Sequence, residues 1–203
     1  MVRCRMIDNF CFSIMVVAGI FFVSVFLFLI KIIVSLKRKM LYLNELTQKD
    51  ELTQAYTRRY FLEILEYHLR LLHRYHNSSA VLMIDVDDFK QINDTHGHLF
   101  GDEVLVHIVN ECNLKLREGD VLARFGGDEF ILLCPLIDRE DIFVVIEKIQ
   151  DALRTYKNIP ISISVGVCLF SHSLSAEAIV QCADRALYEA KEKGKNRIEC
   201  VMP

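Results

Sequence analysis

The sequence contains no closely spaced pair of cysteines. Its seven cysteines are scattered along 203 residues, their number is odd, and no two of them form a Cys-x-x-Cys motif. A disulfide framework uses an even set of cysteines and a structural zinc site uses closely spaced pairs, so both are disfavoured. Unpaired thiols are instead typical of a protein that stays in a reducing cytoplasm.

An excess of positive charge is also missing from most of the chain. Residues 1–39 hold six Lys or Arg and one acidic residue, so residues 40–203 hold 18 basic and 26 acidic residues, a net charge of −8. Because nucleic-acid binding depends on cationic contacts to phosphates, we expect no nucleic-acid partner. If this part of the chain handles a polyphosphate, a divalent cation must supply the missing positive charge.

One long apolar segment is present near the N-terminus. Phe10 to Ile30 is a run of 21 residues without a charge, and at about 1.5 Å per residue this length crosses the roughly 30 Å hydrocarbon core of a bilayer. The sequence therefore predicts a transmembrane helix and its exit over residues 10–36, after a short extracytoplasmic N-terminus at residues 1–9. A cleaved signal peptide is the alternative, but the segment is long for one and no small-x-small cleavage site follows it.

Basic residues predict the orientation of this segment. Four of them follow it, namely Lys31, Lys37, Arg38 and Lys39, whereas Arg3 and Arg5 precede it together with Asp8. Because cytoplasmic flanks carry the excess of Lys and Arg, the C-terminal side is expected in the cytoplasm.

Residues 37–49 are predicted to form a helical stalk. Leu36, Met40 and Leu43 follow one another at spacings of four and then three, which suits either a parallel dimer stalk or a plain amphipathic linker. No stretch rich in Pro, Gly or Ser follows, and this favours stiff coupling to the next domain.

Residues 50–203 alternate between helix and strand patterns. Apolar spacing predicts helices over residues 58–76, from 101–102 to about 116, 138–156 and 175–193, and apolar runs predict strands over 80–84, 121–125, 130–134, 161–170 and 197–201. Asp102 is expected to cap the second helix. This order predicts an α+β fold with a ferredoxin-like β-α-β-β-α-β core, a central sheet flanked by helices.

Two acidic clusters follow predicted strands. Asp85 and Asp87 come after the strand at 80–84, and Asp128 and Glu129 come after the Gly-Gly pair of a predicted β-hairpin. Neighbouring carboxylates repel each other unless a cation joins them. Each cluster alone is compatible with a solvated turn, but on adjacent strand ends the two would form a cation site.

Five separated blocks of sequence together resemble the GGDEF family of diguanylate cyclases. In chain order they are DELTQAYTRRYF, DVDDFKQINDTHGH, GDEVL, RFGGDEF and ADRALYEAKEKGKNR, spread over about residues 50–201. The resemblance implies a nucleotidyl cyclase-like fold and an enzyme that condenses two GTP molecules into cyclic di-GMP and two pyrophosphates. It also implies a homodimer, since each domain holds one GTP. With the apolar segment at residues 10–30 as its anchor, the chain is expected in the inner membrane of a bacterium.

The resemblance assigns the acidic clusters to metal binding and catalysis. By the family pattern, the Asp85 carboxylate, the Val86 carbonyl and Asp128 would hold two Mg²⁺ ions, for which Mn²⁺ can substitute. Hard oxygen ligands are those that Mg²⁺ prefers, and two ions can stabilise both attacking and leaving oxygens. Asp128 is the family's candidate proton acceptor and Glu129 supports the same site; which of the two takes the proton is left open.

Other family positions imply GTP binding. Asn93 and Asp102 match the guanine-binding pair, and a carboxylate that accepts from the guanine N1–H and amine suits guanine but not adenine. His98 matches a further substrate contact. Three lysines match the family's cations near the triphosphate, namely Lys90, Lys191 and Lys195. Lysines late in a helix also complement its dipole, which is the alternative for the last two.

Arg117 and Asp120 match the family's inhibitory product site. They form an Arg-x-x-Asp element that ends five residues before GGDEF, and the resemblance implies that cyclic di-GMP binds there and inhibits. The alternative is a charged loop after a helix.

The first block departs from the family pattern D-x-L-T-G-L-x-N-R-R at Gln54, Ala55 and Thr57. We expect these changes to alter coupling and not to remove chemistry. Two other functions stand beside an active cyclase. One is a catalytically silent GGDEF domain that binds GTP or cyclic di-GMP as a receptor or scaffold, which the intact carboxylates disfavour. The other is a related cyclase with another base specificity, which Asp102 disfavours.

Overall fold

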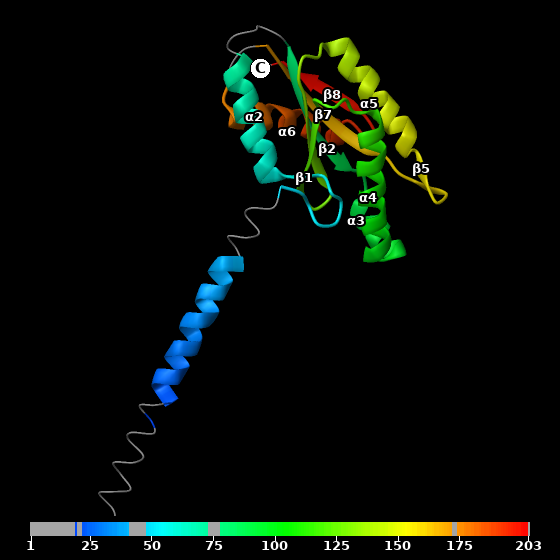
Figure 1. Ribbon diagram of the computed structural model, residues 1–203. Helices are drawn as coiled ribbons and strands as arrows, with labels where there is room; N and C mark the ends of the chain where they lie inside the picture. The colour runs from blue at the N-terminus through cyan, green and yellow to red at the C-terminus, as the bar shows by residue number, and fades with distance from the viewer. Residues whose placement is uncertain (1–18, 20–21, 41–47, 73–77, 172–173, 203) are drawn as a thin grey trace, which may run out of the picture. The chain divides into compact units, whose positions relative to one another are not determined.

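The computed structural model describes residues 19, 22–40, 48–72, 78–171 and 174–202 and divides the chain into two units, Met1–Thr47 and Gln48–Pro203 (Figure 1). In the first unit, residues 22–40 form one helix. Among the helices in these described ranges, none is long and apolar enough to cross a membrane. Residues 1–9, most of the apolar segment before residue 22, and residues 41–47 of the predicted stalk lie outside the described residues, so the anchor and the stalk stay predictions.

The second unit is built on a six-stranded sheet in the order β1-β3-β4-β2-β7-β8. Its strands are β1 (Tyr56–Thr57), β2 (Ser79–Val86), β3 (Val121–Gly126), β4 (Glu129–Cys134), β7 (Ile163–Phe170) and β8 (Ile198–Val201). Strand β2 pairs antiparallel with β4 on one side and with β7 on the other, whereas the β1–β3 and β7–β8 pairs are parallel. The predicted α+β fold is confirmed, and β3-β4-β2-β7 have the order of a ferredoxin-like core.

The central strand β2 is buried along its whole length. All eight of its residues are buried, as expected for an apolar strand that is covered on both faces. Its alternate side chains enter two separate cores, Leu82 and Ile84 on one face and Val81 and Met83 on the other. The strand is therefore a rigid support for the acidic residues at its C-terminal end.

Helices cover both faces of the sheet (Figure 1). Leu65 of α2 (Arg58–Leu72) and Ile179 of α6 (Ala176–Glu192) join the core that contains Val81. Ile108 of α4 (His98–Lys115) and Ile146 of α5 (Arg139–Leu153) join the core that contains Leu82. The sheet is thus the middle layer between two layers of helices.

The region before α4 differs from the prediction. A separate helix, α3 (Phe89–His96), precedes α4, and Gly97, with φ of 86°, separates the two. Helix α4 begins at His98, so the prediction that Asp102 is its N-cap is wrong, because Asp102 lies one turn inside the helix. The sequence pattern missed α3 because its eight residues bury only Ile92.

Short strands also depart from the prediction. The end of the helix predicted over residues 138–156 and the residues before the strand predicted from 161 form a small hairpin of β5 (Thr155–Tyr156) and β6 (Ile159–Pro160). Its turn residues Lys157 and Asn158 have φ of 48° and 66°. Like β1, these two-residue strands are too short to show the alternation that marks a strand.

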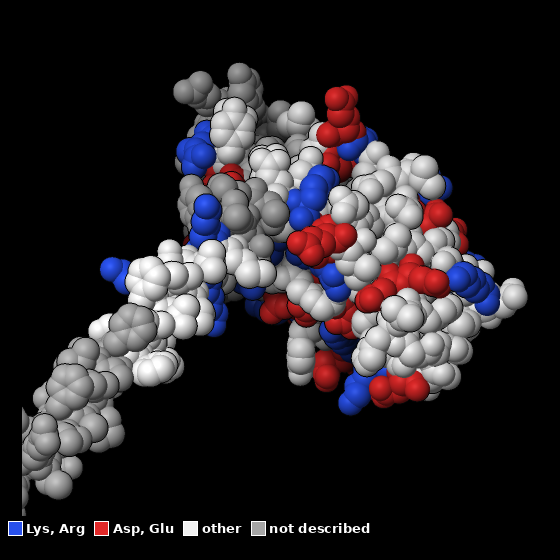
Figure 2. All heavy atoms as spheres, turned by 60° about the horizontal axis from the view of Figure 1, so that its bottom comes forward, with Lys and Arg blue, Asp and Glu red and all other residues white. Residues whose placement is uncertain are grey.

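Charged side chains of both signs are interspersed over the face of the second unit shown in Figure 2. Several form exposed pairs, such as Lys157 with Glu103 at 2.6 Å and Lys193 with Glu199 at 2.7 Å. Exposed pairs of this kind contribute little to stability, typically below about 1 kcal/mol.

Candidate active site

The two acidic clusters meet where β2 ends and β4 begins. Asp85 and Glu129 are direct partners across the β2–β4 ladder. The Val86 N–H donates to the Asp128 carbonyl over 3.4 Å, which joins the two strand ends. The prediction that the clusters lie on adjacent strand ends is confirmed.

The β3–β4 hairpin differs in detail from a Gly-Gly turn. Gly126 pairs with Glu129, so the two-residue loop consists of Gly127 and Asp128, and the register shifts between Arg124 and Gly126 as in a β-bulge. Gly127 has φ of +48°, which glycine adopts without the steric cost of a side chain. Asp128 therefore lies in the loop itself, while Glu129 is the first residue of β4.

Arg124 holds this loop in place. Its Nε and Nη2 donate to the Gly127 carbonyl at 2.9 and 2.8 Å, and its Nη1 lies 3.1 Å from Asp50 Oδ1. Asp50 also accepts from the backbone N–H and the hydroxyl of Thr53, at 2.9 and 2.7 Å. The sequence gives no signal of this contact, since Asp50 and Arg124 are 74 positions apart.

Burial and neighbouring carboxylates raise the pKa values of Asp85 and Glu129. Burial raises the pKa of Asp85, the charges of Asp128 and Asp87 add to the rise, and the hydrogen bond and charge of Lys191 oppose it. Burial also raises the pKa of Glu129, together with the charge of Asp85, again opposed by Lys191. A second cation here would relieve the repulsion, since opposite charge favours the ionised carboxylate.

Two lysines of the closing motif reach these acidic residues. Lys191, near the end of α6, places Nζ 2.7 Å from Asp85 Oδ2, and Lys195, in the following loop, places Nζ 2.7 Å from Asp88 Oδ1. The structure therefore brings together residues that are more than 100 positions apart. Both ammonium groups are partly exposed, so an anionic ligand bound next to Asp85 and Asp88 could contact them.

The predicted guanine-binding residues lie on the α3–α4 pair. Asn93 of α3 and Asp102 of α4 are half-buried, and His98 is exposed at the start of α4. A Cβ atom built on Gly101 would lie 1.9 Å from Asn93 Oδ1, so the Asn93 side chain rests against α4 next to Asp102. Lys90 is exposed on α3. The geometry shows these placements; their roles stay predictions.

The predicted metal site is not a complete cage of side chains. Within the described residues, no group of three or more His, Cys, Asp or Glu side chains could hold a metal ion. Mg²⁺ is usually bound through one or two carboxylates plus substrate phosphates and water. Asp85, Asp128 and the Val86 carbonyl, gathered at one pair of strand ends, are donors of that kind. The donor set therefore fits an ion that arrives with a polyphosphate.

Arg117 and Asp120 form a compact turn between α4 and β3. The Arg117 N–H donates to Asp120 Oδ2 at 2.8 Å, and the Asp120 N–H donates to the Arg117 carbonyl at 3.0 Å. Arg117 is exposed and Asp120 is half-buried. The turn fixes the two residues relative to each other, and their predicted role in product binding remains open.

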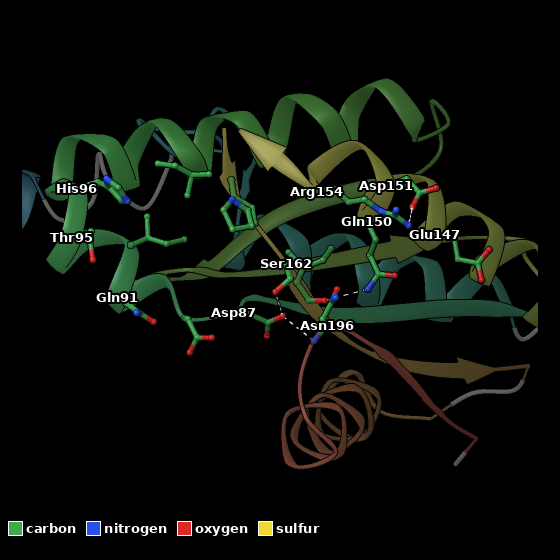
Figure 3. Close-up of a pocket in the computed structure, with 16 residues that line it drawn as sticks. Asp87, Gln91, Thr95, His96, Glu147, Gln150, Asp151, Arg154, Ser162 and Asn196 are labelled. Carbon is green, nitrogen blue, oxygen red and sulfur yellow. Dashed lines mark hydrogen bonds and ion pairs between the residues drawn. The ribbon is translucent and has the colours of Figure 1, made fainter. Parts of the chain in front are cut away.

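A cavity of about 1120 Å³ lies between α3, α5 and the segment before β7 (Figure 3). Gln91 and Thr95 line it from α3, and Gln150 and Arg154 line it from the region of α5. None of the predicted guanine-binding residues, Asn93, His98 and Asp102, is among the residues that line it. The cavity is therefore separate from the predicted guanine site, on another side of α3.

Comparisons with known proteins identify the family of the chain. Residues 47–197 match the family described as diguanylate cyclase, GGDEF domain. The chain is 38% identical over 156 residues to diguanylate cyclase DgcP of Pseudomonas aeruginosa, covering 74% of this chain and 23% of DgcP. It is 37% identical over 170 residues to diguanylate cyclase A of Treponema denticola, covering 77% of this chain and 45% of that protein. The chain thus spans less than half the length of these two relatives.

Solved structures have the same fold. The GGDEF domain of DgcB from Caulobacter crescentus, crystallised in complex with c-di-GMP, matches with a TM-score of 0.72 and 25% identity, covering 76% of this chain and 95% of that chain. Together with the family match over residues 47–197, this likeness leads to one conclusion: the chain belongs to the diguanylate cyclase GGDEF domain family.

Proposed function

We propose that this protein is a diguanylate cyclase that condenses two GTP molecules into cyclic di-GMP and two pyrophosphates. One observation carries the proposal: Asp85 and Glu129 are paired at adjacent strand ends beside the Asp128 loop, and Lys191 lies 2.7 Å from Asp85. Carboxylates that can bind a metal, next to cations that can bind phosphates, are the groups that phosphoryl transfer requires. Membership of the family and the curated cyclases among its relatives support the same reaction.

In this proposal the acidic residues where β2 ends and β4 begins bind the divalent cations. Asp85, the Val86 carbonyl and Asp128 would hold Mg²⁺, with Mn²⁺ as a possible substitute, and the bound ions would neutralise triphosphate charge. Asp128 or Glu129 accepts the proton of the attacking 3′-hydroxyl. The raised pKa of Glu129 brings this carboxylate closer to the range where a general base works well.

Other residues of the chain bind and orient GTP. Asn93 and Asp102 contact the guanine, with His98 at the edge of the base site. The cations Lys90, Lys191 and Lys195 contact the phosphates. On GTP binding, Lys191 and Lys195 would exchange their contacts with Asp85 and Asp88 for phosphate oxygens, with which they also make charge-assisted hydrogen bonds.

The reaction implies that two copies of the chain meet. One GTP per domain cannot close a two-fold ring, so a homodimer with facing sites is required. Residues 10–30 would anchor the chain in the cytoplasmic membrane and residues 37–49 would raise the local concentration of domains. If so, specific activity in detergent should rise with protein concentration, as measured alongside light scattering; constant activity from a species that stays monomeric would refute the dimer.

The test of the activity uses the purified full chain with GTP and MgCl₂, with cyclic di-GMP detected by chromatography. Asp85→Asn is the matched control, since it removes one charge with little change in shape. Production of cyclic di-GMP by the wild type and its loss in the variant are expected. GTP binding without turnover in the wild type would instead indicate a silent receptor domain, and rapid turnover of ATP would indicate a different base specificity.

A further inference from the structure

Asp87 is a buried carboxylate that no proposed catalytic step uses. The residue is 5% exposed. Oδ1 accepts from the Ser164 hydroxyl at 2.6 Å, and Oδ2 accepts from the Ser162 hydroxyl at 2.7 Å and from the Asn196 N–H at 3.0 Å. The Asp87 N–H also donates to the Ser162 carbonyl at 2.9 Å. Figure 3 shows Asp87, Ser162 and Asn196 converging at one wall of the cavity.

These contacts join three distant parts of the chain. Asp87 follows β2, Ser162 and Ser164 lie 75 and 77 positions further on, and Asn196 is 109 positions away in the loop after α6. A charged acceptor makes stronger hydrogen bonds than a neutral one, and more so in a buried setting. Asp87 therefore fixes the loop after α6 against the end of β2.

That loop has a backbone conformation that needs support. Lys195 and Asn196 have φ of 61° and 46°, a region that residues with a side chain adopt at an energetic cost unless their surroundings hold them there. Two hydrogen bonds do so, from the Lys195 N–H to the Ala190 carbonyl at 3.1 Å and from the Asn196 N–H to the Asp87 carboxylate. Residues 193–197 are exposed, so packing gives them little additional support.

We propose that Asp87 is a positioning residue for GTP binding. Its bond to the Asn196 N–H keeps residues 195 and 196 in the left-handed conformation. This conformation places the Lys195 ammonium next to Asp88, beside the acidic residues at the end of β2. Without that bond the loop relaxes toward right-handed or extended conformations, with room to move because Asn196 borders the cavity. Lys195 then loses its fixed position, and GTP loses a phosphate contact. The proposal rests on the proposed function only in taking GTP as the ligand.

The test compares two sides of the same carboxylate. Asp87→Ala removes the bond to Asn196, whereas Ser164→Ala removes a bond from the opposite oxygen and leaves the loop tethered. GTP affinity is measured by calorimetry on the full chain, with Ca²⁺ replacing Mg²⁺ to slow turnover, and KM, kcat and Tm are measured with Mg²⁺. We expect Asp87→Ala to raise the Kd and KM of GTP about tenfold while kcat changes less than about threefold.

The controls separate positioning from stability. Ser164→Ala should lower Tm and leave Kd and KM within about twofold of the wild type. Asp87→Asn keeps one oxygen for the Asn196 N–H and an amide that the Ser164 hydroxyl can accept from, so it should retain most of the affinity. Asn196→Gly added to Asp87→Ala should recover part of the affinity, because glycine removes the steric cost of the left-handed conformation at residue 196 but does not replace the lost tether.

Three outcomes would overturn the proposal: equal shifts of Kd in Asp87→Ala and Ser164→Ala, unchanged Kd in Asp87→Ala, or no recovery with Asn196→Gly. If Asp87→Ala does not fold, Asp87→Ser takes its place, since its shorter side chain cannot reach the Asn196 N–H. Wild-type chain that binds no GTP would refute the proposed function as well. Wild type that binds GTP but forms no cyclic di-GMP refutes the cyclase activity alone, and the calorimetric comparison still decides the role of Asp87.

Discussion

Gly101→Ala should separate guanine binding from fold stability. Gly101 is buried on α4, and an added Cβ would lie 1.9 Å from Asn93 Oδ1, 2.9 Å from Asn93 Cγ and 3.2 Å from Phe89 Cζ. The two shortest contacts are to the far end of a side chain that can rotate. The substitution therefore displaces the Asn93 amide without moving the backbone of either helix.

The expected magnitudes follow from these contacts. Alanine within a helix is favoured over glycine by about 1 kcal/mol, and moving Asn93 from its preferred side-chain conformation costs about 0.5 to 1.5 kcal/mol. The two terms nearly cancel, so the free energy of unfolding should change little. In contrast, loss of the proposed hydrogen bond from Asn93 to guanine, about 0.5 to 1.5 kcal/mol, should raise the KM of GTP about two- to tenfold.

The assay is a double-mutant cycle with Asn93→Ala. Steady-state KM and urea unfolding are measured for the two single variants and for the double variant. Because both single variants remove the same amide from the site, the effect of the double variant on KM should equal that of either alone. Additive effects on KM, or a loss of more than about 3 kcal/mol of unfolding free energy in Gly101→Ala, would show that Gly101 serves packing and not the placement of Asn93.

Three further predictions concern the proton acceptor, feedback and pH. Asp128→Asn should abolish cyclic di-GMP synthesis with an unchanged circular dichroism spectrum; retained synthesis would refute its role. Arg117→Ala should leave initial rates nearly unchanged and remove the slowdown as product accumulates, with product titration by calorimetry as the check: equal affinity in wild type and variant would mean a charged loop only. Burial lowers the pKa of His68, whose Nε2 lies 2.9 Å from Ser79 Oγ. The unfolded chain therefore binds a proton at this histidine more readily than the folded chain does, and protonation favours unfolding. Its contribution to stability is present above about pH 6.5 and is lost as the pH falls; urea unfolding at pH 7.5 and 5.5 should show a smaller loss in His68→Gln than in wild type.

The main strands were predictable because their pattern is local. The apolar run from Ala80 to Ile84 predicts a buried strand, and the structure extends it to β2 from Ser79 to Val86. Glycines mark the β3–β4 hairpin in the same way, although the loop is one residue later than a Gly-Gly turn. The predicted meeting of Asp85 with Glu129 then follows from strand order, because antiparallel neighbours bring the end of one strand to the start of the other.

The contacts that hold the site were not predictable from spacing. Asp50 reaches Arg124 across 74 positions and Asp87 reaches Asn196 across 109, and no periodicity in the sequence connects such pairs. The division between α3 and α4 was missed for another reason. A helix that buries one residue, Ile92, lacks the repeated apolar positions from which helices are recognised.

The Arg124 contacts explain how a glycine loop can hold Asp128, the proposed catalytic carboxylate, in a fixed place. Glycine makes the left-handed conformation of residue 127 accessible but also leaves many others accessible, so the loop needs a tether. The Arg124 guanidinium supplies it with two bonds to the Gly127 carbonyl, and Asp50 holds the guanidinium from the other side. Burial raises the pKa of Asp50, but its hydrogen bonds with Thr53 and the charge of Arg124 outweigh this and lower the pKa overall, so Asp50 stays ionised. A lysine in place of Arg124 would keep the charge but could not bond Gly127 and Asp50 with one planar group. The position of Asp128 thus depends, through Arg124, on Asp50 near the start of the second unit.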